Sequence, residues 1–238
     1  MKRNLFSSCF HLHIPHIISN LHQKTSPKPT YIQPNLNKLF RPYENPHQSR
    51  SWPQHNRQMQ SRRTFREYQY TREIAAAVVA RLQALGHDAE VLVPEFEDIL
   101  LSERVRRVNA WCRRLGKDNV VLVSVHVDAA GSDGQRHTAT GWSCYTSPGR
   151  TAGDRLADCL YRAAQKHLQG HKIRTDYSDG DADKEACFAL LTRTRFAAAL
   201  TENGFQDSKE SLAFLESPAG KKAVIGLHVE GIIDFYRE

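Results

Sequence analysis

Two stretches of the chain have the composition of buried strands, and each carries one polar residue suited to chemistry at or near its end. The run VVLVSVHV at 120–127 is almost wholly apolar and carries His126, and the run AAALTE at 197–202 ends in Glu202. Continuous apolar runs are typical of strands covered by helices on both faces. Ligands bind at the carboxyl ends of the strands in such sheets, so we expect His126 and Glu202 to share a site. The alternative at each position is a side chain satisfied by backbone groups at the rim of the sheet.

Apolar residues at helical spacing alternate with these strands. Helices are expected at residues 72–86, from a cap at Ser102 to 115, at 152–168 and at 219–236, with further strands at 90–93 and 141–146. This alternation predicts an α/β fold: a single three-layer domain over residues 65–238, with a largely parallel or mixed sheet and helices on both faces. An irregular N-terminal segment precedes it.

Residues 1–64 differ in composition from the rest of the chain. They contain no glycine, seven of the ten prolines and six of the twelve histidines, and no sustained helical or strand period. They also hold ten Lys and Arg against one acid, whereas residues 65–238 hold 23 basic and 25 acidic residues. The net charge of +7 therefore belongs to this segment, and the near-neutral domain does not indicate a nucleic-acid partner. We interpret residues 1–64 as a disordered tail or an out-of-frame segment, with a targeting presequence as an alternative.

Two further expectations follow from composition. Five cysteines occur without a CxxC pair, which favours buried free thiols over a disulfide framework. No run of 18 apolar residues occurs, so no transmembrane helix is expected. The histidines and the proline that follow the basic start of the chain make it a poor fit to a signal peptide, so the sequence leaves the route of export open.

A third acid, Glu67, stands just before the first expected helix, where a carboxylate alone would be read as a favourable charge at a helix N-terminus. Three separated motifs nevertheless resemble one family. These are Glu67 before the helix REIAAAVVARLQALG, the segment RVRRVNA followed by VSVHVDAA, and LTENGF with Glu202. In this order and spacing, residues 65–238 resemble the zinc-dependent N-acetylmuramoyl-L-alanine amidases, which cleave peptidoglycan.

The resemblance implies a role for each of these residues. Glu67 and His126 would be zinc ligands, and Glu202 the catalytic acid and base in hydrolysis of the amide between N-acetylmuramic acid and L-alanine. Zn²⁺ takes His and carboxylate ligands and leaves one position open in catalytic sites, so these residue types suit the chemistry. The expected partners are peptidoglycan or muropeptides, and the expected site of action is the cell envelope. Asp128 is a departure, because the family often has asparagine there.

One ligand implied by the resemblance is not found in its expected form. The family has a further histidine in a Gly-His pair upstream of Glu67, but residues 1–64 contain no glycine, and His55 is the nearest candidate. A reading shifted forward by one nucleotide would place a glycine codon at Trp52–Pro53, followed by a codon that can encode histidine. We hypothesise that residues from about 45 to 64, and by extension 1–64, are such an out-of-frame reading, with coincidence from codon degeneracy as the alternative.

Other functions stay open on the sequence alone. A missing ligand would favour an inactive amidase-like module that binds peptidoglycan fragments, although such a module has no need of Glu202. Another zinc peptidase or amidase is a further alternative, since ligand type does not name the substrate. Residues 174–185, RTDYSDGDADKE, are expected to form a solvated loop at the rim of the site, because their spacing does not fit a calcium-binding EF-hand.

Overall fold

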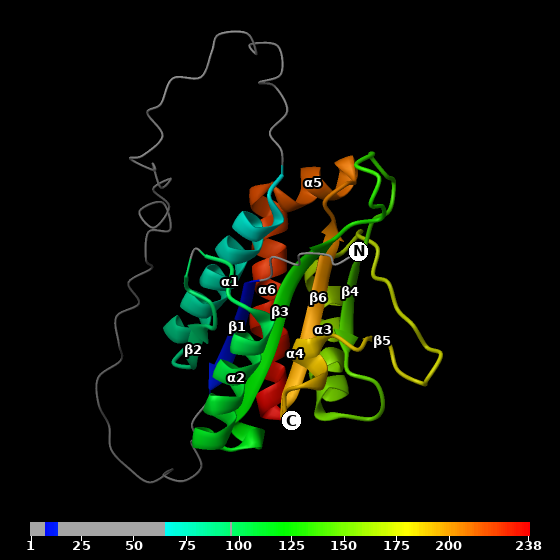
Figure 1. Ribbon diagram of the computed structural model, residues 1–238. Coiled ribbons are helices and arrows are strands. Elements are labelled where there is room, and N and C mark those ends of the chain that lie inside the picture. Colours follow the sequence, from blue (N-terminus) through cyan, green and yellow to red (C-terminus); the bar gives the residue numbers. More distant parts are fainter. Residues whose placement is uncertain (1–7, 14–64, 96) are drawn as a thin grey trace, which may run out of the picture. The chain divides into compact units, whose positions relative to one another are not determined.

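The computed structural model describes residues 8–13, 65–95 and 97–238, and a mixed sheet lies at its centre (Figure 1). The strands are β1 Ser8–His13, β2 Asp88–Val91, β3 Val120–Asp128, β4 Trp142–Thr146, β5 Lys184–Glu185 and β6 Ala197–Phe205. Their order across the sheet is β2-β1-β3-β6-β4-β5. The β3–β6 and β4–β5 pairs are parallel, and the β1–β2, β1–β3 and β4–β6 pairs are antiparallel. The expected α/β sheet is therefore confirmed in its mixed form.

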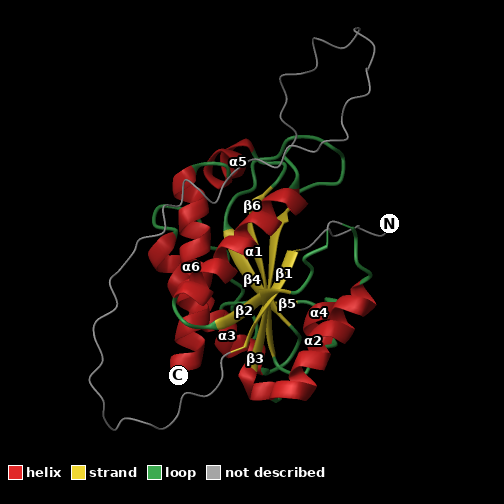
Figure 2. Cartoon of the chain, turned by 90° about the vertical axis from the view of Figure 1, so that its left-hand side faces the viewer, coloured by secondary structure: helices red, strands yellow, loops and turns green. Residues whose placement is uncertain are grey.

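Helices cover both faces of this sheet. They are α1 Glu67–Ala84, α2 Leu101–Leu115, α3 Ala152–His167, α4 Ala189–Thr192, α5 Lys209–Leu215 and α6 Pro218–Arg237, with a 3₁₀ turn η3 at Lys117–Asn119. Figure 2 shows α1, α3 and α6 on one side of the strands and α2 and α4 on the other. The expected three-layer arrangement is confirmed.

Alternation along the central strands sorts their side chains between two apolar cores. Val121, Val123 and Val125 pack with residues of α1, α3 and α6, whereas Leu122 packs with residues of α2 and α4. Residues 120–127 are all buried, and burying each such aliphatic side chain stabilises the fold by about 1.5–3 kcal/mol. Because side chains alternate between faces, His126 points toward the face that carries α2 and α4.

Several element boundaries differ from the expected ones. The helix α1 begins at Glu67 itself, and the ring of Tyr70, buried in its first turns, lies 5.6 Å from that of Phe65. The N-cap of α2 is Leu100, with no side-chain capping bond, so Ser102 is not the cap. The strand β6 continues to Phe205, three residues beyond Glu202, and all nine of its residues are buried.

The N-terminal segment supplies one strand, which the sequence analysis missed. Although residues 1–64 showed no strand period, Ser8–His13 forms β1 between β2 and β3 and belongs to the same compact unit as residues 65–238. A segment of this length is too short for its side-chain alternation to identify it as a strand. Its backbone forms hydrogen bonds with the two neighbouring strands, β2 and β3. Its register sets His11 opposite Leu122 and His13 opposite Val120, toward the start of β3 and away from His126. His55 and the out-of-frame hypothesis for residues 45–64 lie outside the described residues.

The acidic loop at 174–185 is only partly solvated, in contrast to the expectation. Tyr177 is well exposed, but Asp183 is 2% exposed, and its Oδ2 accepts a hydrogen bond of 2.6 Å from Thr146 Oγ1. Burial raises the pKa of Asp183 to about 7; the Thr146 hydrogen bond opposes this rise, and the neighbouring Asp181 adds to it. The loop is therefore anchored to β4 by a buried carboxyl group.

The two expectations drawn from composition can be compared with the structure. Cys112, Cys144, Cys159 and Cys187 are free thiols, and two of these are buried, so the expected absence of a disulfide framework holds for these four. In the part of the chain that the structure describes, no helix has the length and apolar character needed to cross a membrane.

Candidate active site

The candidate site lies at the carboxyl ends of β3 and β6, which run side by side through the centre of the sheet (Figure 1). His126 and Glu202 are direct register partners on these parallel strands. Cross-strand partners project from the same face of a sheet, so the two side chains lie next to each other. Both residues are buried, His126 to 3% exposure and Glu202 to 9%. The structure therefore brings the two predicted site residues together.

Glu67 completes this group from the first turn of α1. Its Oε1 lies 3.3 Å from His126 Nδ1 and accepts a hydrogen bond of 3.3 Å from the backbone N–H of Val127. The carboxylate is thus held against β3 by the residue that follows the histidine. All three residues named from the sequence meet at one end of the sheet.

The geometry of His126 suits a metal ligand. Its Nδ1 is buried with no hydrogen-bond partner in the described ranges, and it faces the Glu67 carboxylate. Its Nε2 lies 3.0 Å from Ser124 Oγ. With Nδ1 as the ligand atom, Nε2–H donates to Ser124, and this second interaction fixes the ring orientation, as is usual for metal-bound histidines. One nitrogen and one carboxylate oxygen thus lie close together, but residues 8–13, 65–95 and 97–238 contain no cluster of three His, Cys, Asp or Glu able to hold a metal.

A β-bulge in β6 immediately follows Glu202. His126 pairs with Glu202 but Asp128 pairs with Phe205, so β6 holds one extra residue between these pairs. Gly204 has a φ of +102° there, a conformation that favours glycine. Bulges are common beside active sites, where they re-aim side chains.

The side chain of Asn203 makes hydrogen bonds across the sheet at this bulge, where the backbone ladder is interrupted. Its Nδ2 donates to the backbone carbonyl of His126 at 3.0 Å and to Thr201 Oγ1 at 3.1 Å, and its Oδ1 accepts from Trp142 Nε1 at 3.1 Å. Thr201 Oγ1 in turn lies 2.8 Å from Nε2 of the fully buried His228. Burial lowers the pKa of His228 to about 4, so its ring is neutral near pH 7. This neutral network ties the backbone of His126 to β4 and α6.

The rim of the site beyond His126 carries further charge. Asp128 Oδ2 lies 3.5 Å from Arg174 Nη1, and its Oδ1 accepts from the N–H of Ala129. Burial raises the pKa of Tyr145, and the negative charges of Asp128 and Glu202 raise it further. Tyr145 therefore stays protonated beside these carboxylates.

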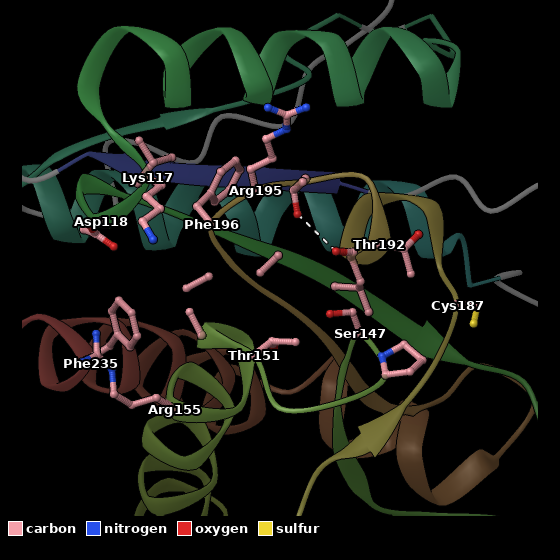
Figure 3. A pocket seen from close by; sticks show the side chains of 17 residues that line it. Lys117, Asp118, Ser147, Thr151, Arg155, Cys187, Thr192, Arg195, Phe196 and Phe235 are labelled. Atoms are coloured by element: carbon pink, nitrogen blue, oxygen red, sulfur yellow. Dashed lines mark hydrogen bonds between the residues drawn. The ribbon is translucent and has the colours of Figure 1, made fainter.

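Two cavities are lined by other residues than Glu67, His126 and Glu202. One of about 570 Å³ is lined by Val120 and Ala197, the first residues of β3 and β6, and by Arg155 and Phe235 (Figure 3). It opens at the amino ends of the strands, opposite to His126 and Glu202. The other, of about 210 Å³, adjoins Asn203 and Gly204. The chemistry of the residues, and not cavity size, locates the candidate site.

Arg104 and Asn109 lie in the segment RVRRVNA, which is part of the family resemblance, and both side chains hold loops in place. Arg104 is buried and bonds the carbonyl of Ile99 and the carboxylate of Asp98. Asn109 Nδ2 donates to the carbonyl of Arg193 at 2.8 Å. Their described contacts are therefore with the chain around α2 and α4.

Sequence reasoning missed Ser124, Asn203 and Arg174 at this site. Ser124 stands two residues before His126, so alternation along a strand could have identified it as sharing the histidine's face. Asn203 follows Glu202 directly, but nothing in the sequence indicates a bulge that would let it reach His126. Arg174 comes from a distant loop, and no local pattern predicts its position.

Comparison with known proteins identifies the family. Residues 54–234 match the family described as N-acetylmuramoyl-L-alanine amidase, which is most of the chain. The chain belongs to this amidase family. A curated relative, the N-acetylmuramoyl-L-alanine amidase CwlM of Bacillus licheniformis, is 29% identical over 170 residues, which cover 71% of this chain and 59% of the relative. The chain thus spans about three fifths of the length of that amidase.

Solved amidase structures share the fold. AmiC2 of Nostoc punctiforme superimposes with a TM-score of 0.59 at 20% identity, covering 72% of this chain and 85% of that one. An N-acetylmuramoyl-L-alanine amidase of Clostridium difficile 630 gives 0.59 at 21% identity, covering 73% and 86%. Ami1 of Mycobacterium smegmatis gives 0.58 at 20%, covering 72% and 77%. At these identities the likeness concerns the fold, which is that of amidase domains.

Proposed function

We propose that this chain is a peptidoglycan amidase that hydrolyses the amide between the lactyl group of N-acetylmuramic acid and L-alanine. The observation that carries the proposal is the convergence of Glu67, His126 and Glu202 at the carboxyl end of the sheet in a member of the amidase family. The family supports the substrate class, and the three side chains supply the groups that such a hydrolysis uses.

The metal that we propose is Zn²⁺, held by Glu67, His126 and a third ligand from outside the described residues. The orphaned Nδ1 of His126 beside the Glu67 carboxylate supports the first two ligands. Zn²⁺, when bound, polarises a carbonyl and makes water more acidic. We expect the third ligand upstream of Glu67, and the family match begins at residue 54, just beyond the Trp52–Pro53 codons.

We assign the proton transfers to Glu202. Its carboxylate takes a proton from the attacking water as the water oxygen bonds to the lactyl carbonyl carbon. As the carbon–nitrogen bond breaks, the same carboxyl group gives that proton to the departing nitrogen of L-alanine. The products are a lactyl carboxylic acid and a peptide with a free amino terminus. A buried carboxylate opposite His126 suits this exchange, because few waters compete for the proton.

The test measures metal content and hydrolysis in the same preparation. The full chain is equilibrated with Zn²⁺, its zinc content is measured by atomic emission, and new L-alanine amino termini are counted after incubation with purified peptidoglycan. Glu202→Gln keeps the shape of the side chain but cannot accept the proton, so we expect a loss of about 10²–10⁴-fold in hydrolysis with unchanged zinc content. Glu216→Gln, an exposed position at the end of α5, is the matched control and should hydrolyse normally.

A second candidate function follows from the ligand set, since the described residues supply two ligands only. An amidase-like module that binds peptidoglycan fragments without cleaving them would hold little zinc and show no hydrolysis. If residues 1–64 are out of frame, we expect this behaviour of the chain as printed. A nucleotide sequence across codons 40–70 tests that cause, because a Gly-His pair in frame with Phe65 would restore the third ligand.

A further inference from the structure

Arg174 is held firmly at the edge of β4. Its backbone N–H donates to the carbonyl of Trp142 at 2.7 Å, and its own carbonyl accepts from the hydroxyl of Tyr161 at 2.9 Å. Gly141 makes room for its side chain, because a Cβ at that glycine would lie 2.9 Å from Arg174 Cγ. The position of this arginine is therefore fixed by contacts on both sides of its backbone.

The strand contacts of this segment bring Arg174 to the level of the candidate active site. Trp142, which bonds its backbone, is the register partner of Asn203, and the next residue of β4 pairs with Glu202. The guanidinium lies 4.9 Å from the ring centre of Phe205 and 3.5 Å from Asp128 Oδ2. Asp128 and Phe205 are the register pair just beyond His126 and Glu202. Arg174 thus borders the site on its solvent side.

Its guanidinium has hydrogen-bonding capacity that the described residues do not use. The contact with Asp128 is a single one at 3.5 Å, long for a hydrogen bond, and Nη1 is buried without a hydrogen-bond partner in the described part of the chain. An arginine carries five N–H donors, and a buried donor without an acceptor costs stability. By contrast, Arg107 donates at 2.9 Å to both Glu95 and Glu103. The side chain of Arg174 as a whole is 29% exposed, so part of it is open to solvent although Nη1 itself is buried.

The charges around the site indicate a role for Arg174 in binding substrate. Glu67, Asp128 and Glu202 make the described part of the site rich in carboxylates, which repel any substrate that carries a carboxylate of its own. A peptide substrate with a carboxylate close to the scissile amide would therefore need a positive charge at this rim. A guanidinium matches a carboxylate in shape and charge and forms two parallel hydrogen bonds with it.

We propose that Arg174 binds the carboxylate of the stem-peptide residue that follows L-alanine, and so selects substrates in which this group is not amidated. This inference rests on the proposed function, since it names the part of the same substrate that the site recognises. The simpler reading, in which Arg174 only neutralises Asp128, predicts no discrimination between a carboxylate and an amide at that place in the peptide.

The test compares two probes that differ by one group. Isothermal titration measures the affinity of the full chain for N-acetylmuramoyl-L-alanyl-D-isoglutamate and for its carboxamide analogue, with a chelator present so that no turnover occurs. We expect the carboxylate form to bind at least about tenfold more tightly, the gain typical of a hydrogen-bonded charge pair. Arg174→Gln should reduce this ratio to near one, and Arg174→Lys should keep part of it.

Arg155→Gln is the matched control. Arg155 also stacks on a phenylalanine, 4.3 Å from the ring centre of Phe235, but it lies by the amino ends of the strands (Figure 3). It should leave the affinity ratio unchanged. Urea unfolding of each variant shows whether it is folded. If Arg174→Gln does not fold, the ratio of the two probe affinities in the wild type still tests the proposal.

Each outcome bears on one proposal. Equal wild-type affinities for the two probes, binding of neither probe, or a ratio that persists in a folded Arg174→Gln variant would overturn the role of Arg174. The proposed function is judged separately, by release of L-alanine amino termini from peptidoglycan by the zinc-loaded wild type. If the wild type hydrolyses peptidoglycan but binds the two probes equally, only the role of Arg174 is overturned and the proposed function stands.

Discussion

Replacing Asn203 by aspartate exchanges one NH₂ group for an oxygen at the centre of the buried network. The new oxygen would face the backbone carbonyl of His126 and Thr201 Oγ1, which now accept hydrogen bonds of 3.0 and 3.1 Å from the amide. The bond from Trp142 Nε1 to the other oxygen, 3.1 Å long, can remain. Leaving a buried carbonyl without its donor costs about 1–3 kcal/mol, and burying a carboxylate at a residue only 4% exposed adds to that. We expect Asn203→Asp to lower the free energy of unfolding by about 2–4 kcal/mol at pH 8.

The pH dependence of this loss distinguishes the mechanism from a general packing defect. Burial and the facing carbonyl oxygen raise the pKa of the introduced carboxyl group, and in its protonated form this group can donate to His126 again. The destabilisation should therefore shrink from pH 8 to pH 5, as measured by urea unfolding followed by far-ultraviolet circular dichroism. Gln165→Glu, an amide-to-acid change on the exposed face of α3, should cost less than about 0.5 kcal/mol. A loss below that value for Asn203→Asp at pH 8, or one independent of pH, would refute the reasoning.

Two further predictions concern stability away from the site. Asp183 has a pKa raised by burial to about 7, so the folded state holds a proton that the unfolded chain releases near pH 4; its contribution is complete below pH 4 and lost as pH rises through 7. The contribution of Asp183 to stability should therefore fall by about 2 kcal/mol between pH 5 and 7, whereas that of the buried His228 rises over much of this range. The difference in unfolding free energy between the wild type and Asp183→Asn isolates the first effect in urea titrations, and a difference that does not change with pH would contradict it. Gly220→Ala should destabilise by about 2 kcal/mol or more although alanine favours helices, because its Cβ would lie 1.9 Å from the carbonyl oxygen of Phe214; a rise in thermal midpoint would contradict this.

Local patterns in the sequence were sufficient for the layers and for two candidate site residues. The apolar run at 120–127 and the helical spacing of Ile74, Val78 and Leu82 have one stable arrangement, a sheet covered by helices. His126 and Glu202 were candidates from the same pattern, because ligands bind at the carboxyl ends of buried strands, although a side chain satisfied by backbone groups at the rim was the alternative. Glu67 needed the family resemblance, since one acid near a helix start has an ordinary explanation.

The remainder depends on contacts between distant segments, which local patterns do not encode. The strand β1 is set by backbone pairing with β2 and β3 and not by its own alternation. Asn203 acquires its partners through a bulge whose register depends on β3 and β6 together. Asp183, placed by composition in a solvated loop, is buried because the loop folds back onto Thr146.

The two proposed metal ligands, Glu67 and His126, differ in rigidity because Glu67 stands at the start of α1. His126 lies within a buried strand of the central sheet, whereas Glu67 is the first residue of a helix whose N-cap, Arg66, makes no side-chain capping bond. The terminal turn of a helix opens more readily than its middle, so the carboxylate must be ordered before it can serve as a ligand. A cation bound by the Glu67 carboxylate would hold this first turn in place, and its affinity would report how readily the turn becomes ordered. Amide hydrogen exchange in the first turn of α1 thus becomes a measure of metal occupancy that requires no substrate.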